Sequence, residues 1–245
     1  MIFPRGCETL HHERQGMKAL AKPIDRDAWR SILASAMLIL DHLEQAGNGR
    51  PDLALGGGTV LMFRFQHRLS KDVDFFLHDV QWLSFLTPRL NDYVAAMVSD
   101  YSEQANCVKL ILPQGDIDFI AATQVTGIAP PEFLDFADRR FALEATAEIL
   151  AMKLLYRAAF FKPRHVFDLA ACIRLDPDSA RAAVRATMAQ GPVLMRRLKH
   201  MAGLALPELC ADIQPLGEFD GLVGSMVESV RQFVAETSSD STLKP

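Results

Sequence analysis

The chain has 245 residues, of which 49% are hydrophobic, and a formal net charge of −4 at pH 7. This length allows one large domain or two modest ones with a substantial core. The acidic balance argues against a generally basic nucleic-acid-binding protein, although it leaves room for a local basic patch.

Cysteine usage and hydropathy point to a cytoplasmic protein. The four cysteines lie far apart without Cys-x-x-Cys spacing, which fits reduced thiols better than a zinc site or a disulfide framework. The charged N-terminal residues contain no apolar core of signal-peptide length. No stretch approaches the roughly 20 apolar residues that span a bilayer, so we expect no membrane partner.

The first predicted elements are a helix, a short strand and a second helix. Apolar residues recur at helical spacing from Asp25 to Ala46, and Asp25 is a candidate N-cap. An apolar strand is expected over residues 53–55. Three glycines follow it and lead into a helix over residues 59–67. The glycines therefore occupy a strand-to-helix turn.

This turn opens a run whose residue types suit a phosphate and metal site. Phosphate oxygens at Gly57-Gly58-Thr59 could accept hydrogen bonds from free N–H groups at the helix N-terminus. Asp72 and Asp74 are two apart in a predicted strand, so period two places both carboxylates on one face. Two hard oxygen ligands on a rigid strand suit Mg²⁺, which combines carboxylates with substrate phosphates.

Simpler interpretations are a plain turn followed by a solvated strand end. They leave unexplained two acids beside Phe75 and Phe76, where burial without a cation is costly. A Walker P-loop is excluded because the Gly-Lys-Ser/Thr ending is missing. A dinucleotide fingerprint is excluded because the glycines lack the Gly-x-Gly-x-x-Gly spacing.

A third carboxylate is expected from a strand pair further along the chain. Residues 107–112 and 116–121 are predicted strands joined by a turn at Gly115. Asp116 and Asp118 share one face of the second strand. Asp118 is the preferred third acid because it is embedded in apolar residues, whereas Asp116 adjoins the turn and is interpreted as a solvated acid.

Other segments are predicted to be mainly helical. One helix is expected over residues 83–98, with Pro88 in its first turn. The chain is expected to turn helical after Pro131, with residues 132–140 packing over the sheet. Later helices are expected over 144–161, from 162 onward, and over 178–189, 193–201 and 216–235. Lys153 and Arg157 lie four apart on one of them and share a face.

Several of these residues together resemble one family. The residues that carry the resemblance are Gly57, Gly58, Thr59, Arg68, Ser70, Asp72, Asp74, Lys153, Arg164 and Asp168. The run from Gly57 to Asp74 resembles the signature of AbiEii/AbiGii-type toxin nucleotidyltransferases, within the polymerase-beta-like superfamily. Lys153 matches the lysine of a distal motif, and Arg164 and Asp168 match the arginine and second acid of an Arg-Asp-x-x-Asp segment. The resemblance covers roughly residues 30 to 175, and His165 stands where the family has its first Asp.

The resemblance and the element pattern together imply an α/β (α+β) fold, a small mixed twisted sheet of nucleotidyltransferase type followed by a helical C-terminal domain. The expected divisions are an N-terminal arm (1–25), a nucleotidyltransferase domain (26–130), a helical domain (131–236) and a disordered tail (237–245). The active site is expected in the cleft between the two domains.

The site residues are expected to hold a metal, bind the nucleotide and assist catalysis. The expected metal ligands are Asp72, Asp74 and Asp118, with two Mg²⁺ ions and Mn²⁺ as the alternative. The expected catalytic residues are these three acids, Lys153 and Asp168. The expected nucleotide-binding residues are Gly57, Gly58, Thr59, Arg68, Ser70, Lys153, Arg157 and Arg164.

Three roles remain open at this stage. Arg68 and Ser70 either contact phosphate or brace the loop. Asp168, four residues beyond Arg164, could orient that guanidinium. His165 could accept a proton near neutral pH, or it could mark a diverged enzyme.

The reaction implied is metal-dependent transfer of a nucleotide from an NTP to a hydroxyl. By resemblance, the acceptor is a tRNA 3′ end or a protein, the role is that of a toxin in a toxin–antitoxin or phage-defence system, and a cognate antitoxin is the expected partner. The alternatives are an NTP-binding pseudoenzyme that serves as an interaction module, and a nucleotidyltransferase acting on an antibiotic-type small molecule.

Overall fold

Short strands with alternating burial build a mixed sheet in the computed structural model, which describes residues 27–241. The strands are β1 (Leu53–Leu55), β2 (Val73–Leu77), β3 (Asp100–Gln104), β4 (Cys107–Leu112), β5 (Gly115–Ala121), β6 (Glu132–Phe136) and β7 (Arg139–Leu143). Their order is β3-β4-β5-β2-β1-β7-β6. The pairs β2–β5 and β1–β7 are parallel and the other neighbours are antiparallel.

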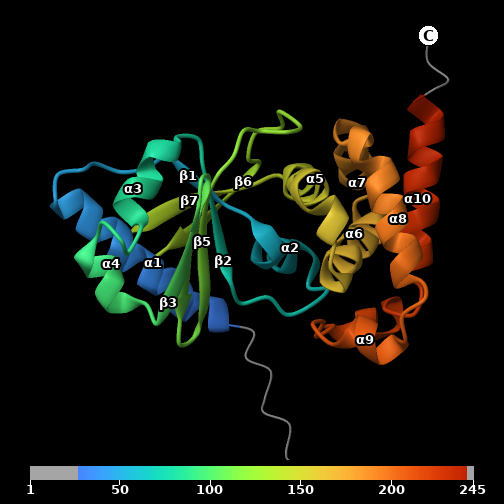
Figure 1. The fold of residues 1–245 in the computed structure, drawn as a ribbon, viewed down its shortest axis with the longest axis horizontal. Coiled ribbons are helices and arrows are strands. Elements are labelled where there is room, and N and C mark those ends of the chain that lie inside the picture. Colours follow the sequence, from blue (N-terminus) through green and yellow to red (C-terminus); the bar gives the residue numbers. More distant parts are fainter. Residues whose placement is uncertain (1–26, 242–245) are drawn as a thin grey trace, which may run out of the picture.

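One face of the sheet is covered by helix α1 (Ala28–Gln45), which buries its apolar stripe against β2 and β5 (Figure 1). Phe75 and Phe119 stack beneath it with ring centroids 5.2 Å apart, and both are fully buried. Because successive strand residues point to opposite faces, the residue immediately before each phenylalanine points away from this core. These residues are Asp74 and Asp118, whose side chains therefore lie on the opposite face of the sheet.

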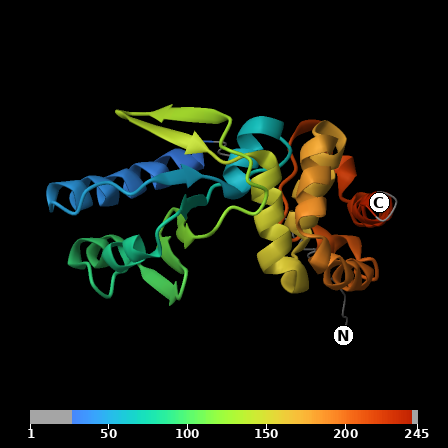
Figure 2. The same ribbon diagram turned by 90° about the horizontal axis from the view of Figure 1, so that it is seen from above.

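Helices assemble beside the sheet into a second half. The remaining helices are α2 (Gly57–Phe65), α3 (Leu83–Leu86), α4 (Asp92–Met97), α5 (Thr146–Arg157), α6 (Pro163–Leu175), α7 (Pro177–Ala186), α8 (Gly191–Met201), α9 (Leu206–Cys210) and α10 (Met226–Ser241). Helices α5 to α8 and α10 pack on one another, and α2 lies between them and the sheet (Figures 1 and 2). Arg68 pairs with Pro215 as an isolated bridge, which ties the two halves together again.

The prediction that the chain turns helical after Pro131 is wrong for residues 132–143. They form the hairpin β6–β7, with Ala137 at φ +52° in its turn. Leu143 pairs in parallel with Leu55, so the hairpin extends the sheet beyond β1 (Figure 2). In β7, Phe141 and Leu143 are buried whereas Arg140 is exposed and Ala142 is half-buried, which is the period-two burial of a strand. The sheet therefore crosses the expected division at residue 130, and the helical half begins at Thr146.

Two other expectations need correction. The single helix over 83–98 is divided into α3 and α4, because Thr87 before Pro88 takes an extended conformation and Asn91 caps a new helix. The tail was expected to be disordered from Thr237, but α10 continues to Ser241. Its apolar stripe continues to the fully buried Thr237, which extends the packed face.

The expected mixed sheet followed by helices is confirmed. The arm over residues 1–25, the candidate cap Asp25 and residues 242–245 lie outside the described residues. Among residues 27–241, every helix is too short or too polar to cross a bilayer.

Candidate active site

The glycine turn is shaped by its own side-chain neighbours. Gly57 has φ +67°, and a Cβ there would overlap the Asp74 carboxylate. A Cβ on Gly58 would lie 2.6 Å from Arg68 Nη2 and 2.8 Å from Ser70 Oγ. Only glycine permits this approach. The turn thus places the N-terminus of α2, with N–H groups that a helix cannot satisfy internally, directly beside Asp74.

The Thr59 and Ser70 side chains support the turn. The Thr59 hydroxyl donates to the backbone carbonyl of Asp72 and lies 3.2 Å from Ser70 Oγ. Thr59 is buried, so its hydroxyl is engaged within the protein. The geometry favours a bracing role for both side chains, and their expected contact with phosphate stays a prediction.

Asp74 and Asp118 are brought together by strand register. They are direct partners across the parallel pair β2–β5 and lie on the same face. Asp72 precedes β2, and its Oδ1 accepts a hydrogen bond from the Asp116 N–H at 3.3 Å. Within residues 27–241, no three His, Cys, Asp or Glu side chains are arranged as a metal site. Two of the three expected ligands therefore lie side by side, and the third is turned to a backbone amide.

Burial leaves these carboxylates poorly compensated. Burial raises the pKa of Asp74 despite the opposing charge of Lys153, and the charge of Asp72 raises it further. Burial and the charge of Asp74 raise the pKa of Asp118 to about 6, against the opposing charge of Lys109. Paired hard oxygen donors that lack sufficient positive charge fit a divalent cation.

Lys109 on β4 is a site residue that the sequence did not single out. Its Nζ lies 2.7 Å from Asp116 Oδ2 and 3.3 Å from Asp118 Oδ2. Asp116, interpreted from the sequence as a solvated acid, is therefore half-buried and ion-paired. The alternation of β4 could have flagged Lys109, because it is the polar residue between Val108 and Leu110, but the strand pairing was needed to place it.

Asp168 lies in a separate, fully buried network. It accepts from Arg68 Nε at 2.6 Å and Nη2 at 3.0 Å, from His67 Nε2 at 2.9 Å and from Lys153 Nζ at 2.6 Å. Burial alone would raise the pKa of this carboxyl, but the charges of Arg68 and Lys153 and the bond from His67 hold it well below its ordinary value. His67 was not predicted from the sequence, and its buried Nδ1 has no hydrogen-bond partner.

The network corrects two expectations about the Arg164 segment. Asp168 contacts Arg68 rather than Arg164, because α6 turns the carboxylate toward the loop that follows α2. The geometry disfavours His165 as a proton acceptor near neutral pH. Burial and the charge of Lys153 lower its pKa to about 2, and its Nδ1 accepts from the Lys162 N–H at the start of α6. It therefore serves as a helix cap.

The Arg68 guanidinium is largely committed to this network. It is 5% exposed, and its third nitrogen donates to the Leu69 carbonyl at 3.0 Å. This geometry favours the bracing alternative over phosphate contact. Arg164 is half-buried at the start of α6, and its expected contact with nucleotide stays a prediction.

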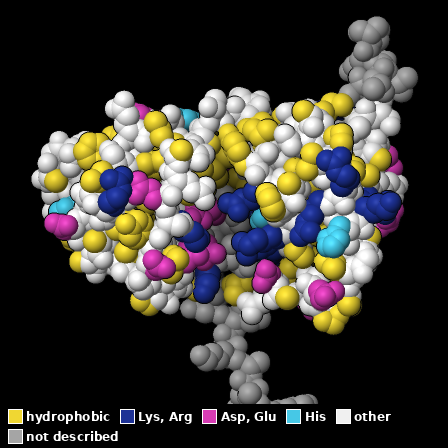
Figure 3. Space-filling model, in the orientation of Figure 1, with side chains coloured by type: hydrophobic (Ala, Val, Ile, Leu, Met, Phe, Trp, Pro, Cys, Tyr) yellow, Lys and Arg dark blue, Asp and Glu magenta, His cyan; other side chains and the backbone are white. Residues whose placement is uncertain are grey.

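Lys153 and Arg157 connect the helical half to the acids. Burial lowers the pKa of Lys153, whose charge reaches both Asp168 and Asp74. Arg157 is exposed one turn later and lies close enough to lower the pKa of Asp74 and of Asp118. Figure 3 shows a hollow between the two halves, with Lys and Arg gathered on the helical side and Asp and Glu on the sheet side. The charge pattern suits a phosphate chain lying between them.

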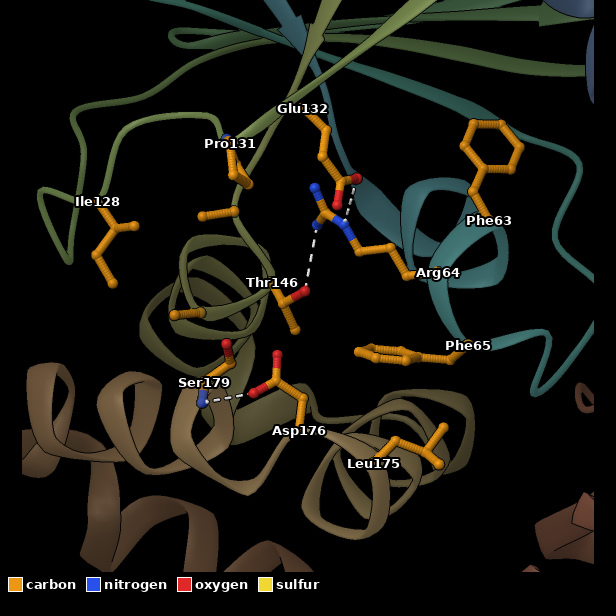
Figure 4. Close-up of a pocket in the computed structure, with 12 residues that line it drawn as sticks. Phe63, Arg64, Phe65, Ile128, Pro131, Glu132, Thr146, Leu175, Asp176 and Ser179 are labelled. Atoms are coloured by element: carbon orange, nitrogen blue, oxygen red, sulfur yellow. Dashed lines mark hydrogen bonds and ion pairs between the residues drawn. The ribbon is translucent and has the colours of Figure 1, made fainter.

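A separate cavity contains none of the predicted site residues. It has a volume of about 690 Å³ between α2, β6 and the starts of α5 and α7. Arg64 crosses it, donating to Glu132 at 3.2 Å and to Thr146 at 3.2 Å (Figure 4). The cavity is thus distinct from the face that carries Asp74 and Asp118.

Comparison with known proteins identifies a family. The sequence profile of the nucleotidyl transferase AbiEii toxin family, of type IV toxin–antitoxin systems, matches residues 38–214. This span includes every residue predicted for the site. No curated protein sequence matches the chain.

Solved structures of three proteins resemble this chain at 15% sequence identity. One is a protein from H. pylori assigned to the nucleotidyltransferases, with a TM-score of 0.44, covering 91% of this chain and 100% of that one. The second is MenT4, a nucleotidyltransferase toxin of Mycobacterium tuberculosis, with a TM-score of 0.46 and coverage of 88% and 86%. The third is the antibiotic-resistance factor ANT(2″)-Ia, with a TM-score of 0.41 and coverage of 69% and 98%.

Proposed function

Because the chain belongs to the AbiEii family of nucleotidyltransferase toxins, we propose that it transfers a nucleotide from an NTP to the hydroxyl at a single-stranded RNA end. The chain is a nucleotidyltransferase, and its family uses NTP substrates and works within type IV toxin–antitoxin systems, which implies a cognate antitoxin. The single observation that carries the proposal is the register pairing of Asp74 with Asp118 beside the glycine turn.

The metal proposed is Mg²⁺, as two ions, held by Asp74 and Asp118 with Asp72 completing the set. Enzymes of this superfamily generally use divalent metal ions, and the carboxylate donors fit a hard cation. When bound, such ions polarise phosphoryl oxygens and lower the pKa of an attacking hydroxyl. Asp72 would join the set by releasing the Asp116 N–H, to which it is bonded at 3.3 Å.

The other site residues act on the phosphate chain. The N–H groups at the start of α2 bind phosphate oxygens at the Gly57 turn. Lys153, with its charge directed at Asp74, and the exposed Arg157 stabilise the negative charge that grows on the leaving pyrophosphate. Asp168 keeps Lys153 in place through its 2.6 Å contact and does not itself touch the nucleotide.

The surface at the end of α5 supports an RNA acceptor. Tyr156 is 54% exposed and Phe160 is 81% exposed, on either side of Arg157 in the sequence. Exposed rings next to basic side chains are the elements that bind single-stranded nucleic acid, where each base stacks on a ring. Lys162, which immediately precedes α6, and Arg196 on α8 add exposed positive charge nearby. Helix α8 contacts the 3-10 turn Ala158–Phe160 that follows α5. An antibiotic-sized acceptor would instead require a closed acidic pocket here.

The test is transfer from each α-³²P-labelled NTP to RNA in Mg²⁺, with total protein and small-molecule acceptors as separate reactions. We expect labelled RNA from the native chain and none from Asp74→Asn or Asp118→Asn, and loss of transfer on metal chelation. Intact NTP binding without transfer to any acceptor would instead support the pseudoenzyme. Label on protein or on an antibiotic-type compound alone would refute the RNA acceptor.

The aromatic surface has its own control. We expect Tyr156→Ala and Phe160→Ala to raise the KM for RNA by roughly tenfold or more, from stacking energies of about 1–3 kcal/mol per base, without changing the KM for NTP. Phe133→Ala is the matched control, because Phe133 is also 54% exposed but lies on β6. An RNA with an unpaired 3′ end should be affected more than one with a fully paired end.

A further inference from the structure

Lys109 occupies a position where it competes with any cation bound to Asp118. It is the register partner of Asp118 across the antiparallel pair β4–β5. Its Nζ lies 3.4 Å from Asp118 Oδ1 and 3.3 Å from Oδ2. Both carboxylate oxygens of a proposed metal ligand therefore face an ammonium group.

A metal ion shared by Asp74 and Asp118 would bring a second positive charge to the same carboxylate. Like charges at such a separation repel strongly where water is partly excluded. Asp118 has a side chain that is only 16% exposed, so solvent screens this repulsion weakly. Lys109 must therefore move away from Asp118 before the metal can hold it fully.

Asp116 offers Lys109 a second partner on the same strand face. Its Oδ2 is already closer to the Lys109 Nζ, at 2.7 Å, than either oxygen of Asp118. The side chains of Lys109 and Asp116 are 32% and 30% exposed, so the ammonium can shift between the two acids without disturbing the core. Asp116 also donates its backbone N–H to Asp72, which connects this pair to the third proposed ligand.

We propose that Lys109 and Asp116 form an exchange pair that sets the affinity of the site for divalent cations. Lys109 neutralises Asp118 when no metal is bound, and Asp116 holds Lys109 when a metal takes Asp118. Both are positioning residues that act through Asp118. The inference rests on the proposed function insofar as Asp74 and Asp118 are the metal ligands.

The experiment is a double-mutant cycle on Mn²⁺ binding, read from the electron paramagnetic resonance signal of free Mn²⁺ and by calorimetry. We expect Lys109→Met to tighten Mn²⁺ binding roughly tenfold, because the competitor is gone. We expect Asp116→Asn to weaken it roughly tenfold, because Lys109 then remains on Asp118. In the double variant, the effect of Asp116→Asn should largely disappear. Lys109→Arg keeps the competing charge and should stay near the native affinity.

Two results would overturn the proposal. One is Mn²⁺ binding that Lys109→Met leaves unchanged or weakens. The other is an Asp116→Asn effect of equal size with and without Lys109, which would mean that Asp116 acts only through its own charge. Lys109→Gln serves as the second variant if the methionine variant does not fold.

Failure of the proposed metal site would give a different pattern. If Asp74→Asn/Asp118→Asn binds Mn²⁺ as tightly as the native chain, the ligands themselves are wrong, whatever Lys109 does. If that variant loses Mn²⁺ and the cycle is additive, the metal site stands and the exchange pair falls.

Discussion

Two buried or partly buried aspartates, Asp118 and Asp168, have opposite electrostatic surroundings. Asp168 is fully buried yet contacts two cationic side chains and an imidazole N–H, and its pKa lies well below the ordinary value. Asp118 is partly exposed, borders a second acid and has its pKa raised to about 6. The deeper carboxylate is the better satisfied one. Burial alone therefore does not reveal which acid is available for chemistry.

The difference distinguishes a carboxylate that stabilises the fold, Asp168, from carboxylates proposed to act in the reaction, Asp74 and Asp118. The network around Asp168 joins the loop after α2 to helices α5 and α6, and its single carboxylate is held by two cationic side chains, Arg68 and Lys153. Burial raises the pKa of Asp74 and of Asp118 despite the charges of Lys153, Lys109 and Arg157, and an added cation would favour the ionised form of both acids. The two regions meet at Lys153, whose Nζ is held by Asp168 and whose charge reaches Asp74.

The largest expected effect contrasts these two acids directly. Asp168→Asn should lower the free energy of unfolding by about 3–5 kcal/mol, because it leaves Arg68 and Lys153 buried without their counter-charge. Asp118→Asn should leave stability unchanged or raise it by about 1 kcal/mol, because it removes a charge that the fold disfavours. Urea unfolding measures both. Equal losses in the two variants would show that the contrast is wrong.

The next effect concerns the backbone conformation of Gly57 and its close approach to the Asp74 carboxylate. Gly57→Ala should cost the strain of a positive φ, about 1–2 kcal/mol, and in addition displace the Asp74 carboxylate, so that transfer activity is lost. Gly127→Ala is the matched control, because Gly127 has φ +69° and open space around a Cβ. The control should lose a similar amount of stability through backbone strain and keep full activity. Loss of activity in both variants would point to strain rather than to the carboxylate.

Much of the site was predictable because its signal is local in the sequence. The glycines, Asp72 and Asp74 lie in one strand–turn–helix–strand unit, and period two placed Asp74 and Asp118 on the correct sheet face. Local spacing also placed Lys153 and Arg157 on one helix face, whereas the expected role of Lys153 came from the family resemblance. These inferences need only the geometry of single elements.

What sequence reasoning missed depends on pairing between distant segments. Lys109 acquires its role from the β4–β5 register, and His67 acquires its role from a carboxylate 101 residues away. The Arg164–Asp168 pairing was inferred from helical spacing, but the tertiary contact with Arg68 took precedence. The β6–β7 hairpin was missed for a similar reason. Its strands are short and carry little alternation of apolar and polar residues, and β7 pairs with β1, which lies far earlier in the chain.

The smallest expected effect is a pH dependence of the stabilisation that the Asp168 network provides. Asp168 has a native pKa below its unfolded value of about 3.9, so its stabilisation is fully present above that value and is lost as pH falls through the native pKa. The groups facing it are Arg68, Lys153 and His67, with the charge of Asp168 also reaching His165.

The stability difference between the native chain and Asp168→Asn should therefore be constant from about pH 8 to pH 5 and shrink below about pH 4. Urea unfolding across this range measures it. A difference that already narrows between pH 7 and pH 5 would contradict the assignment of this stabilisation to the Asp168 carboxylate.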